Sequence, residues 1–190
     1  DLLFKIHANK EKQQLLISAS PNYARIHLTN FNHERPETPP NFCMFLRKQL
    51  EGGIIQNIHQ IEHDRIIIFD IEKRNELGDL GHKKLILEMM GRYSNIIVTD
   101  EQDRILEAIK HSMPFDDAER TLFPGAIYTP PNIDKINPND TEKLHQFLEN
   151  PDNLSFQSLL ENIMGFSPLI IKEIMYQFET NKTPIKEIFH

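Results

Sequence analysis

The sequence predicts an α+β fold, in which an antiparallel, strand-rich domain precedes a helical region. Over the first 111 residues, apolar residues alternate with polar ones or form short runs between turn-forming residues, as strands do. A stretch rich in Pro and turn residues follows over residues 120–140. Beyond it, apolar residues recur at helical spacing. These observations predict a first domain over residues 1–137 and a helical region over residues 138–190.

The first strands are expected as a pair on either side of the polar turn "NKEK". They cover residues 1–8 and 13–19, and a third strand at residues 25–29 follows the turn-prone "SPNY". The chain opens on "DLLFKIHA", which reads as the middle of a strand. We therefore expect a segment to precede it in the natural protein.

One helix is expected over residues 41–50, ended by two glycines. Four apolar residues share one face of it: Phe42, Phe45, Leu46 and Leu50. We expect Phe42, Phe45 and Leu46 to be buried against the antiparallel sheet. Cys43 lies beside them and is expected to be a small structural residue.

A second series of strands follows this helix. The predicted strands are residues 54–61, 65–73, 83–90, 95–100 and 104–111. The first two are joined near residues 62–64, and the next two flank the hairpin turn "GRYSN". Five neighbouring strands with short connections favour an antiparallel sheet.

The last 50 residues predict helices. Their segments are residues 140–150, 155–165, 167–178 and 183–189. Ser167 and Thr183 each precede a Pro, the arrangement of an N-cap followed by the first helical position. Little more than Gly165 and Phe166 separates the second helix from the third, which resembles the start of a helix-hairpin-helix domain.

Composition limits the possible functions. No apolar run approaches the roughly 20 residues that a membrane span needs, so no membrane partner is expected. Cys43 is the only cysteine, which suits a reducing compartment and predicts a cytoplasmic location. The net charge of -7 argues against a generally basic coat. Any RNA contact must therefore be a local patch.

The sequence shows few features of a catalytic site or a metal site. His59 and His63 are four residues apart, which is a ligand spacing only on a helix, and this segment reads as strand. We find no Gly-rich phosphate loop, Ser elbow or paired-carboxylate signature. We therefore expect no catalytic residues, no metal site and no cofactor, which favours a binding protein over an enzyme.

Charged residues at two turns are the candidate functional sites. Asp64 and Arg65 stand at the entrance of an apolar strand, and Arg92 with Tyr93 forms the tip of a hairpin. Arg92 and Tyr93 can meet a nucleotide by charge and stacking, or form an ordinary exposed tip. Asp64 and Arg65 can form a recognition pair, or a turn ion pair worth less than about 1 kcal/mol.

The geometry of a strand constrains a joint role for Asp64 and Arg65. Neighbouring residues of a regular strand point to opposite faces, so both can serve one site only where the backbone is irregular. We therefore expect both residues at the irregular start of the strand, at least partly exposed, on the rim of a concave surface.

Six stretches follow one another along the chain: "LLISASPNYARIHLT", "PPNFCMFLRKQLEGGII", "HDRIIIFDI", "NELGD", "LILEMMGRYSNIIVTD" and "RTLFPGAIYTPP". In order and wording they resemble the NFACT-N domain of the RqcH and NEMF family of ribosome quality-control factors. Bacterial members have also been labelled fibronectin-binding proteins of the FbpA/PavA type. Together they span residues 2–131, and "GFSPLIIKEI" resembles the start of the family's helix-hairpin-helix.

The resemblance implies a fold like the N-terminal domain of formamidopyrimidine-DNA glycosylases. It also implies that the whole protein binds an obstructed large ribosomal subunit. There it recruits alanyl-tRNA, so that a template-free alanine tail marks the stalled chain. It assigns tRNA engagement to the pair that matches Asp64 and Arg65. From the hairpin tip itself, we add Arg92 as an expected neighbour in tRNA binding.

The resemblance leaves two alternatives open. One is a surface adhesin whose partner is fibronectin, and the other is a DNA glycosylase-like nucleic-acid enzyme. The family's coiled coil and later RNA-binding domain are absent from these 190 residues. We therefore expect the chain to be a fragment of a longer protein.

Overall fold

The computed structural model describes residues 1–31, 33–34, 36–75, 77–113, 120–131 and 134–181. The chain forms two compact units. Unit 1 comprises residues 1–61 and 65–129, and unit 2 comprises residues 62–64 together with the chain from Pro130 onward. Unit 1 contains the strands and unit 2 the later helices, which confirms the α+β class. The boundary at residue 137 stays a prediction.

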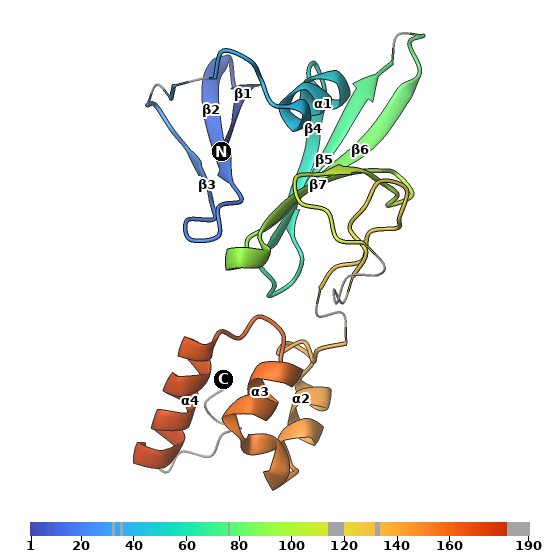
Figure 1. Cartoon of the computed structure of the whole chain (residues 1–190). Coiled ribbons are helices and arrows are strands. Elements are labelled where there is room, and N and C mark those ends of the chain that lie inside the picture. The colour runs from blue at the N-terminus through green and yellow to red at the C-terminus, as the bar shows by residue number, and fades with distance from the viewer. Residues whose placement is uncertain (32, 35, 76, 114–119, 132–133, 182–190) are drawn as a thin grey trace. The chain divides into compact units, whose positions relative to one another are not determined.

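Unit 1 holds two antiparallel sheets, which Figure 1 shows as separate layers. The small sheet has the order β1 (Leu2–Ala8), β2 (Glu11–Ser18), β3 (Arg25–Leu28). The large sheet has the order β4 (Ile54–Gln60), β5 (Ile66–Arg74), β6 (Leu80–Glu88), β7 (Asn95–Asp100), β8 (Ile105–Ala108). Within each sheet, strands that follow one another in the chain pair with one another, as short connections favour.

The turn between β1 and β2 shows how local residues set this topology. Asn9 and Lys10 have φ of 52° and 66°, so both central residues lie in the left-handed region. Two such residues form the type of tight turn whose twist matches that of the flanking strands, and Asn tolerates the conformation well. The pairing of Ala8 with Glu11 follows directly.

Each face of the large sheet has its own core. On one face, the small sheet and helix α1 (Asn41–Leu50) pack against it, and α1 lies where the two sheets meet (Figure 1). The buried residues of this first core are Leu15, Ile17, Leu46, Leu50, Phe69, Ile71, Leu85, Leu87, Ile96 and Val98. On the other face, Leu122 and Tyr128 of the chain after β8 cover a second core.

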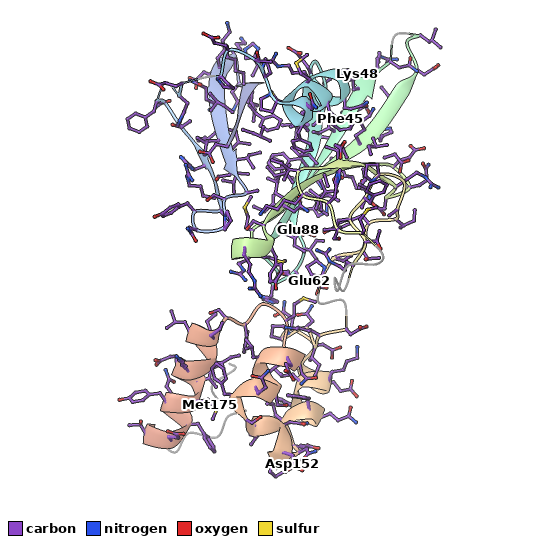
Figure 2. The ribbon with its side chains drawn as sticks, viewed as in Figure 1. Phe45, Lys48, Glu62, Glu88, Asp152 and Met175 are labelled. Carbon is purple, nitrogen blue, oxygen red and sulfur yellow. The ribbon has the colours of Figure 1, made fainter. Side chains whose placement is uncertain are left out.

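The burial predicted for α1 is only partly correct. Leu46 is buried at 5% exposure, but Phe42 and Phe45 are half-buried. Their rings stack with centroids 6.4 Å apart and pack against the rim of the first core, and Figure 2 labels Phe45. Leu46 and Leu50 are the buried residues of α1, so the two large rings lie at the edge of this core. Cys43 is half-buried with a free thiol.

Unit 2 is built from helices. They are α2 (Thr141–Leu148), the 3-10 turn η2 (Pro151–Leu154), α3 (Phe156–Asn162) and α4 (Pro168–Asn181). Asp140 caps α2 by accepting from the Lys143 amide, and Ser167 caps α4 by accepting from the Ile170 amide at 3.3 Å. The helix predicted over residues 183–189 lies outside the described residues. Among the described helices, none has the length and hydropathy for crossing a bilayer.

Candidate functional site

The loop between β4 and β5 carries Asp64 and Arg65. The Ile61 amide donates to the Ile66 carbonyl oxygen at 3.0 Å, which closes a loop of four residues. Glu62 turns the chain with a φ of 40°. Neither Asp64 nor Arg65 belongs to a strand, because β5 begins at Ile66. The expected irregular backbone is therefore present, and side chains of neighbouring residues need not point to opposite faces here.

Asp64 and Arg65 differ in exposure. Arg65 is exposed, whereas Asp64 is only 5% exposed. The prediction that both are at least partly exposed is therefore wrong for Asp64. The physical reason is that residues 62–64 pack within unit 2, while Arg65 belongs to unit 1. Only Arg65 presents the charge of this pair to solvent.

Arg92 lies in the short 3-10 turn η1 (Gly91–Tyr93) between β6 and β7. Its guanidinium carbon lies 4.6 Å from the centre of the Tyr93 ring, and it donates to the Tyr93 hydroxyl at 2.5 Å. Both side chains are exposed, Tyr93 by 65%. A cation over an aromatic face is an attractive pair, so the two side chains hold one another in a defined arrangement.

The backbone of this turn is anchored by Lys110, which follows β8. The Lys110 ammonium donates to the carbonyl oxygens of Arg92 at 3.3 Å and Ala19 at 3.2 Å. The buried Asn95 side chain donates to the Lys110 carbonyl at 2.9 Å and accepts from the Lys110 amide at 3.1 Å. The turn that presents Arg92 is therefore fixed by hydrogen bonds on both sides.

Strand register brings the Arg65 loop and the Arg92 turn to the same end of the large sheet. Ile66 of β5 pairs with Glu88 of β6, which in turn pairs with Asn95 of β7. The Met89 amide also donates to the Arg65 carbonyl at 2.9 Å. Since β5 and β7 are two strands apart, the two arginines start from backbones roughly 10 Å apart. Sequence reasoning expected them to be neighbours, and the sheet provides that placement.

Glu88, labelled in Figure 2, ends β6 beside these loops as a fully buried carboxylate. Its two oxygens each accept from the Arg120 guanidinium at 2.9 Å, and the Tyr128 hydroxyl donates to it at 2.9 Å. Arg120 also donates to the Thr129 carbonyl at 2.6 Å. A bidentate pair of this kind is strong and directional. It ties the chain after β8 to the end of the sheet that carries both loops.

The protonation of this network is set by burial and by Glu88. Burial raises the pKa of Tyr128, and the negative charge of Glu88 raises it further. Burial lowers the pKa of Arg120, but the hydrogen bonds and charge of Glu88 outweigh this and raise it above its ordinary value. Around neutral pH the network therefore contains a charged arginine and a neutral tyrosine. Sequence reasoning missed it, because its members are 32 and 40 residues apart along the chain.

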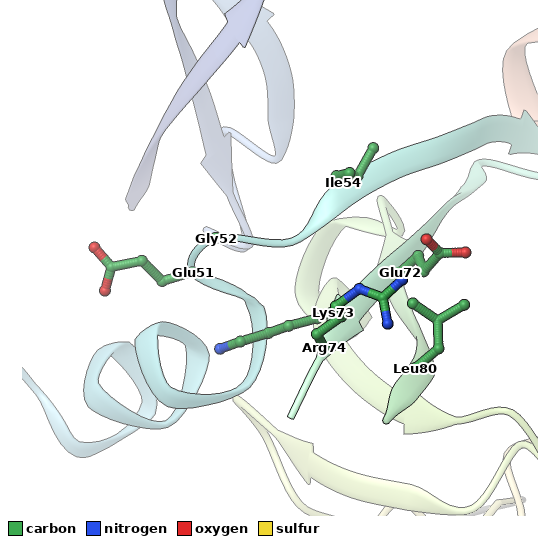
Figure 3. A pocket seen from close by; sticks show the side chains of 7 residues that line it. All are labelled: Glu51, Gly52, Ile54, Glu72, Lys73, Arg74 and Leu80. Carbon is green, nitrogen blue, oxygen red and sulfur yellow. The ribbon is translucent and has the colours of Figure 1, made fainter. Parts of the chain in front are cut away.

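An open cavity of about 380 Å³ lies at the opposite end of β5 (Figure 3). Its charged lining residues are Glu51, Glu72, Lys73 and Arg74. Lys73 donates to the Lys48 carbonyl at 2.7 Å and Arg74 to the Gly78 carbonyl at 2.9 Å. Two carboxylates and two engaged cations do not make a site for an anion. The candidate RNA contacts are therefore those at the Arg65 end.

Comparison with known proteins gives a consistent set of relatives. The "Rqc2 homolog RqcH" of Bacillus subtilis is 41% identical over 181 residues, which cover 93% of this chain and 32% of the relative. The "Ribosome quality control complex subunit 2" of Saccharomyces cerevisiae is 26% identical and covers 86% of this chain. The chain thus spans about a third of the length of its bacterial relative.

Two solved structures resemble the fold closely. The fibrinogen binding protein from Staphylococcus aureus is 39% identical with a TM-score of 0.78, covering 98% of this chain and 67% of that one. The N-terminal domain of fibronectin-binding protein PavA from Streptococcus pneumoniae is 36% identical with a TM-score of 0.77, covering 95% and 68%. The family described as NFACT N-terminal and middle domains matches residues 1–190. A match over its whole length shows that the chain belongs to the family of NFACT N-terminal and middle domains.

Proposed function

We propose that this chain is the tRNA-engaging part of a ribosome quality-control factor. In the full-length protein it acts in the cytoplasm on obstructed large ribosomal subunits. It recruits alanyl-tRNA there, which extends the stalled nascent chain by a template-free alanine tail. The observation that carries the proposal is the 41% identity with the Rqc2 homolog RqcH of Bacillus subtilis. The proposal assigns binding to this chain and no catalytic step.

Two exposed arginines at one end of the large sheet support RNA binding. Arg65 and Arg92 both face solvent from short, hydrogen-bonded connections. A guanidinium can donate two parallel hydrogen bonds to a phosphate, and an exposed ring such as Tyr93 can stack on a base. With a net charge of -7, the chain as a whole does not attract RNA. Binding must therefore depend on a few well-placed contacts.

Asp64 has a different role from Arg65 in this proposal. A carboxylate that is 5% exposed is poorly placed to meet a nucleotide directly. In this proposal it acts through the loop backbone that it shares with Arg65, not by contact with a nucleotide. The pair is required together because one residue positions the other.

The deciding experiment is to sequence the RNA that co-purifies with the full-length protein. The proposal expects enrichment of alanine tRNA together with large-subunit RNA. Arg65→Ala is expected to lose the tRNA. Arg74→Ala serves as its matched control, because it removes an exposed arginine at the other end of β5. Recovery of neither RNA, or of tRNA without preference, contradicts the proposal.

Fibronectin binding is the second candidate function. It is favoured by the names of similar structures, including the fibronectin-binding protein PavA from Streptococcus pneumoniae. This function requires the protein on the cell surface, whereas ribosome quality control requires it in the cytoplasm. Fractionation of cells separates the two, since protein confined to the cytoplasm excludes an adhesin.

A further inference from the structure

The turn between β2 and β3 lies beside the η1 turn that carries Arg92 (Figure 1). One ammonium joins the two turns, because Lys110 donates to the Ala19 carbonyl at 3.2 Å and to the Arg92 carbonyl at 3.3 Å. A Cβ on Gly91 would lie 3.7 Å from the Pro21 carbonyl oxygen, which is ordinary van der Waals contact. Both turns belong to unit 1, so they lie side by side within one folded body.

The bases of the two turns are well ordered. The side chains of Ser18 and Ser94 are fully buried there. The Ser20 amide donates to the Ser18 hydroxyl at 3.3 Å, and the Met90 amide donates to the Ser94 hydroxyl at 2.8 Å. Side chains presented from such anchored turns need little further ordering when a ligand binds, which favours affinity.

Each turn presents an exposed tyrosine. Tyr23 is 72% exposed and Tyr93 is 65% exposed, whereas Tyr128, the third tyrosine of unit 1, is buried. The Arg25 guanidinium donates to the Tyr23 carbonyl at 2.9 Å, and the Arg92 guanidinium lies over the Tyr93 ring. Each exposed ring is therefore accompanied by an arginine.

The charge of this surface is opposite to that of the whole chain, which is -7. The three segments that meet here contain three cations and no Asp or Glu: residues 18–28 with Arg25, residues 89–95 with Arg92, and residues 109–113 with Lys110. Arg25 lies 3.5 Å from the Asp1 carboxylate, but both side chains are exposed and a pair of this kind is weak. A local group of cations attracts a polyanion to this place on an otherwise acidic chain.

We propose that the two turns form one surface for an unpaired RNA segment, with Tyr23 as a second stacking residue in addition to Tyr93. Exposed rings stack on bases of any sequence, and bases are available for such stacking where the RNA is unpaired. Arg92 and Lys110 supply positive charge for the phosphates. That the RNA is a tRNA rests on the proposed function, whereas the surface involves residues of unit 1 alone.

Ultraviolet crosslinking of the full-length protein tests the surface directly. The probe is a uridine RNA of about 12 nucleotides, within the range that a single-stranded site covers, either alone or annealed to its adenosine complement. We expect mass spectrometry to find nucleotide adducts on Tyr23 and Tyr93 with the unpaired RNA, and at least about fivefold fewer with the duplex. Absence of an adduct on Tyr23, or equal yields with the two RNAs, overturns the proposal.

Tyr23→Ala measures the contribution of the ring to tRNA binding. In the full-length protein we expect it to weaken binding of alanine tRNA about tenfold. The slope of log affinity against log salt should not change, because no charge is removed. Tyr23→Phe keeps the ring and should bind within about twofold of the unmodified protein. Phe31→Ala is the matched control with the same small effect, because Phe31 is 80% exposed and follows the other end of β3.

The outcomes separate this surface from the proposed function. Unchanged tRNA affinity in Tyr23→Ala, or an equal loss in Phe31→Ala, overturns the surface. If Arg65→Ala is defective in that case, the proposed function stands without it. If the full-length protein binds no tRNA, the proposed function fails, and the adducts with uridine RNA then decide the surface alone.

Discussion

Glu88 and its partners show how a single buried charge organises the end of the large sheet. Its carboxylate is fully buried and receives hydrogen bonds from Arg120 and Tyr128. Removal of one partner from a buried pair leaves an uncompensated charge, which costs several kcal/mol. The chain after β8 is thus held to the sheet by a contact that tolerates little change.

Arg120→Ala is expected to lower the free energy of unfolding by about 3 kcal/mol, the lower end of the range for a buried pair. The lower end applies because the Arg120 side chain is 18% exposed. Urea unfolding measures the change. Lys84→Ala is the control, because it breaks the more exposed pair with Asp103 and should cost at most about 1 kcal/mol. Equal losses in the two variants contradict the importance of the Glu88 pair.

Tyr128 makes stability depend on alkaline pH. Its folded pKa is raised, whereas the unfolded chain has the ordinary value near about 10. The contribution of this group is therefore complete below about pH 10 and is lost as pH rises further, because only the unfolded state releases the proton. We expect the free energy of unfolding between about pH 9 and pH 11 to fall less steeply in Tyr128→Phe than in the unmodified chain. Tyr23→Phe, at a tyrosine that is 72% exposed, should keep the original slope.

Helix α1 illustrates stabilisation at the scale of an element. Leu46 and Leu50 are its buried residues, and Phe42 and Phe45 cover the edge of the same core. Truncation of a fully buried Phe to Ala lowers the free energy of unfolding by about 3 to 5 kcal/mol. Phe45 is only half-buried, so less apolar area is returned to water on truncation. We therefore expect Phe45→Ala to lower the free energy of unfolding by about 2 kcal/mol. Met44→Ala, on the exposed side of the helix, should be nearly neutral in the same urea titration.

The elements were largely predictable because their signals are local. Alternating apolar residues gave the strands, and the Ser167 cap gave the start of α4. Asp64 was not predictable in the same way. Its burial follows from packing within unit 2, whose other residues begin 66 positions later, at Pro130. No spacing rule in the sequence connects residues 62–64 to the chain from Pro130 onward, so the burial of Asp64 could not be predicted.

At the scale of the whole molecule, charge determines how RNA can be bound. The net charge of -7 disfavours RNA at long range, while Arg65 and Arg92 lie at one end of one sheet. Each arginine that neutralises a phosphate contributes about 0.7 to 0.9 to the slope of log affinity against log salt. A recognition surface made of a few arginines therefore has a shallow salt dependence compared with a generally basic protein.

Arg65→Ala in the full-length protein tests this arrangement directly. Arg65 is exposed, so we expect the variant to fold with a free energy of unfolding within about 0.5 kcal/mol of the original. Alanyl-tRNA recruitment and alanine tailing should be lost, while binding to the large ribosomal subunit is retained. Arg65→Lys keeps the charge but not the two parallel donors, so it should restore the salt slope and only part of the affinity. Arg74→Ala, at the other end of β5, should behave as the unmodified protein. Normal tailing by Arg65→Ala, or an equal defect in Arg74→Ala, contradicts tRNA recognition at this end of the sheet.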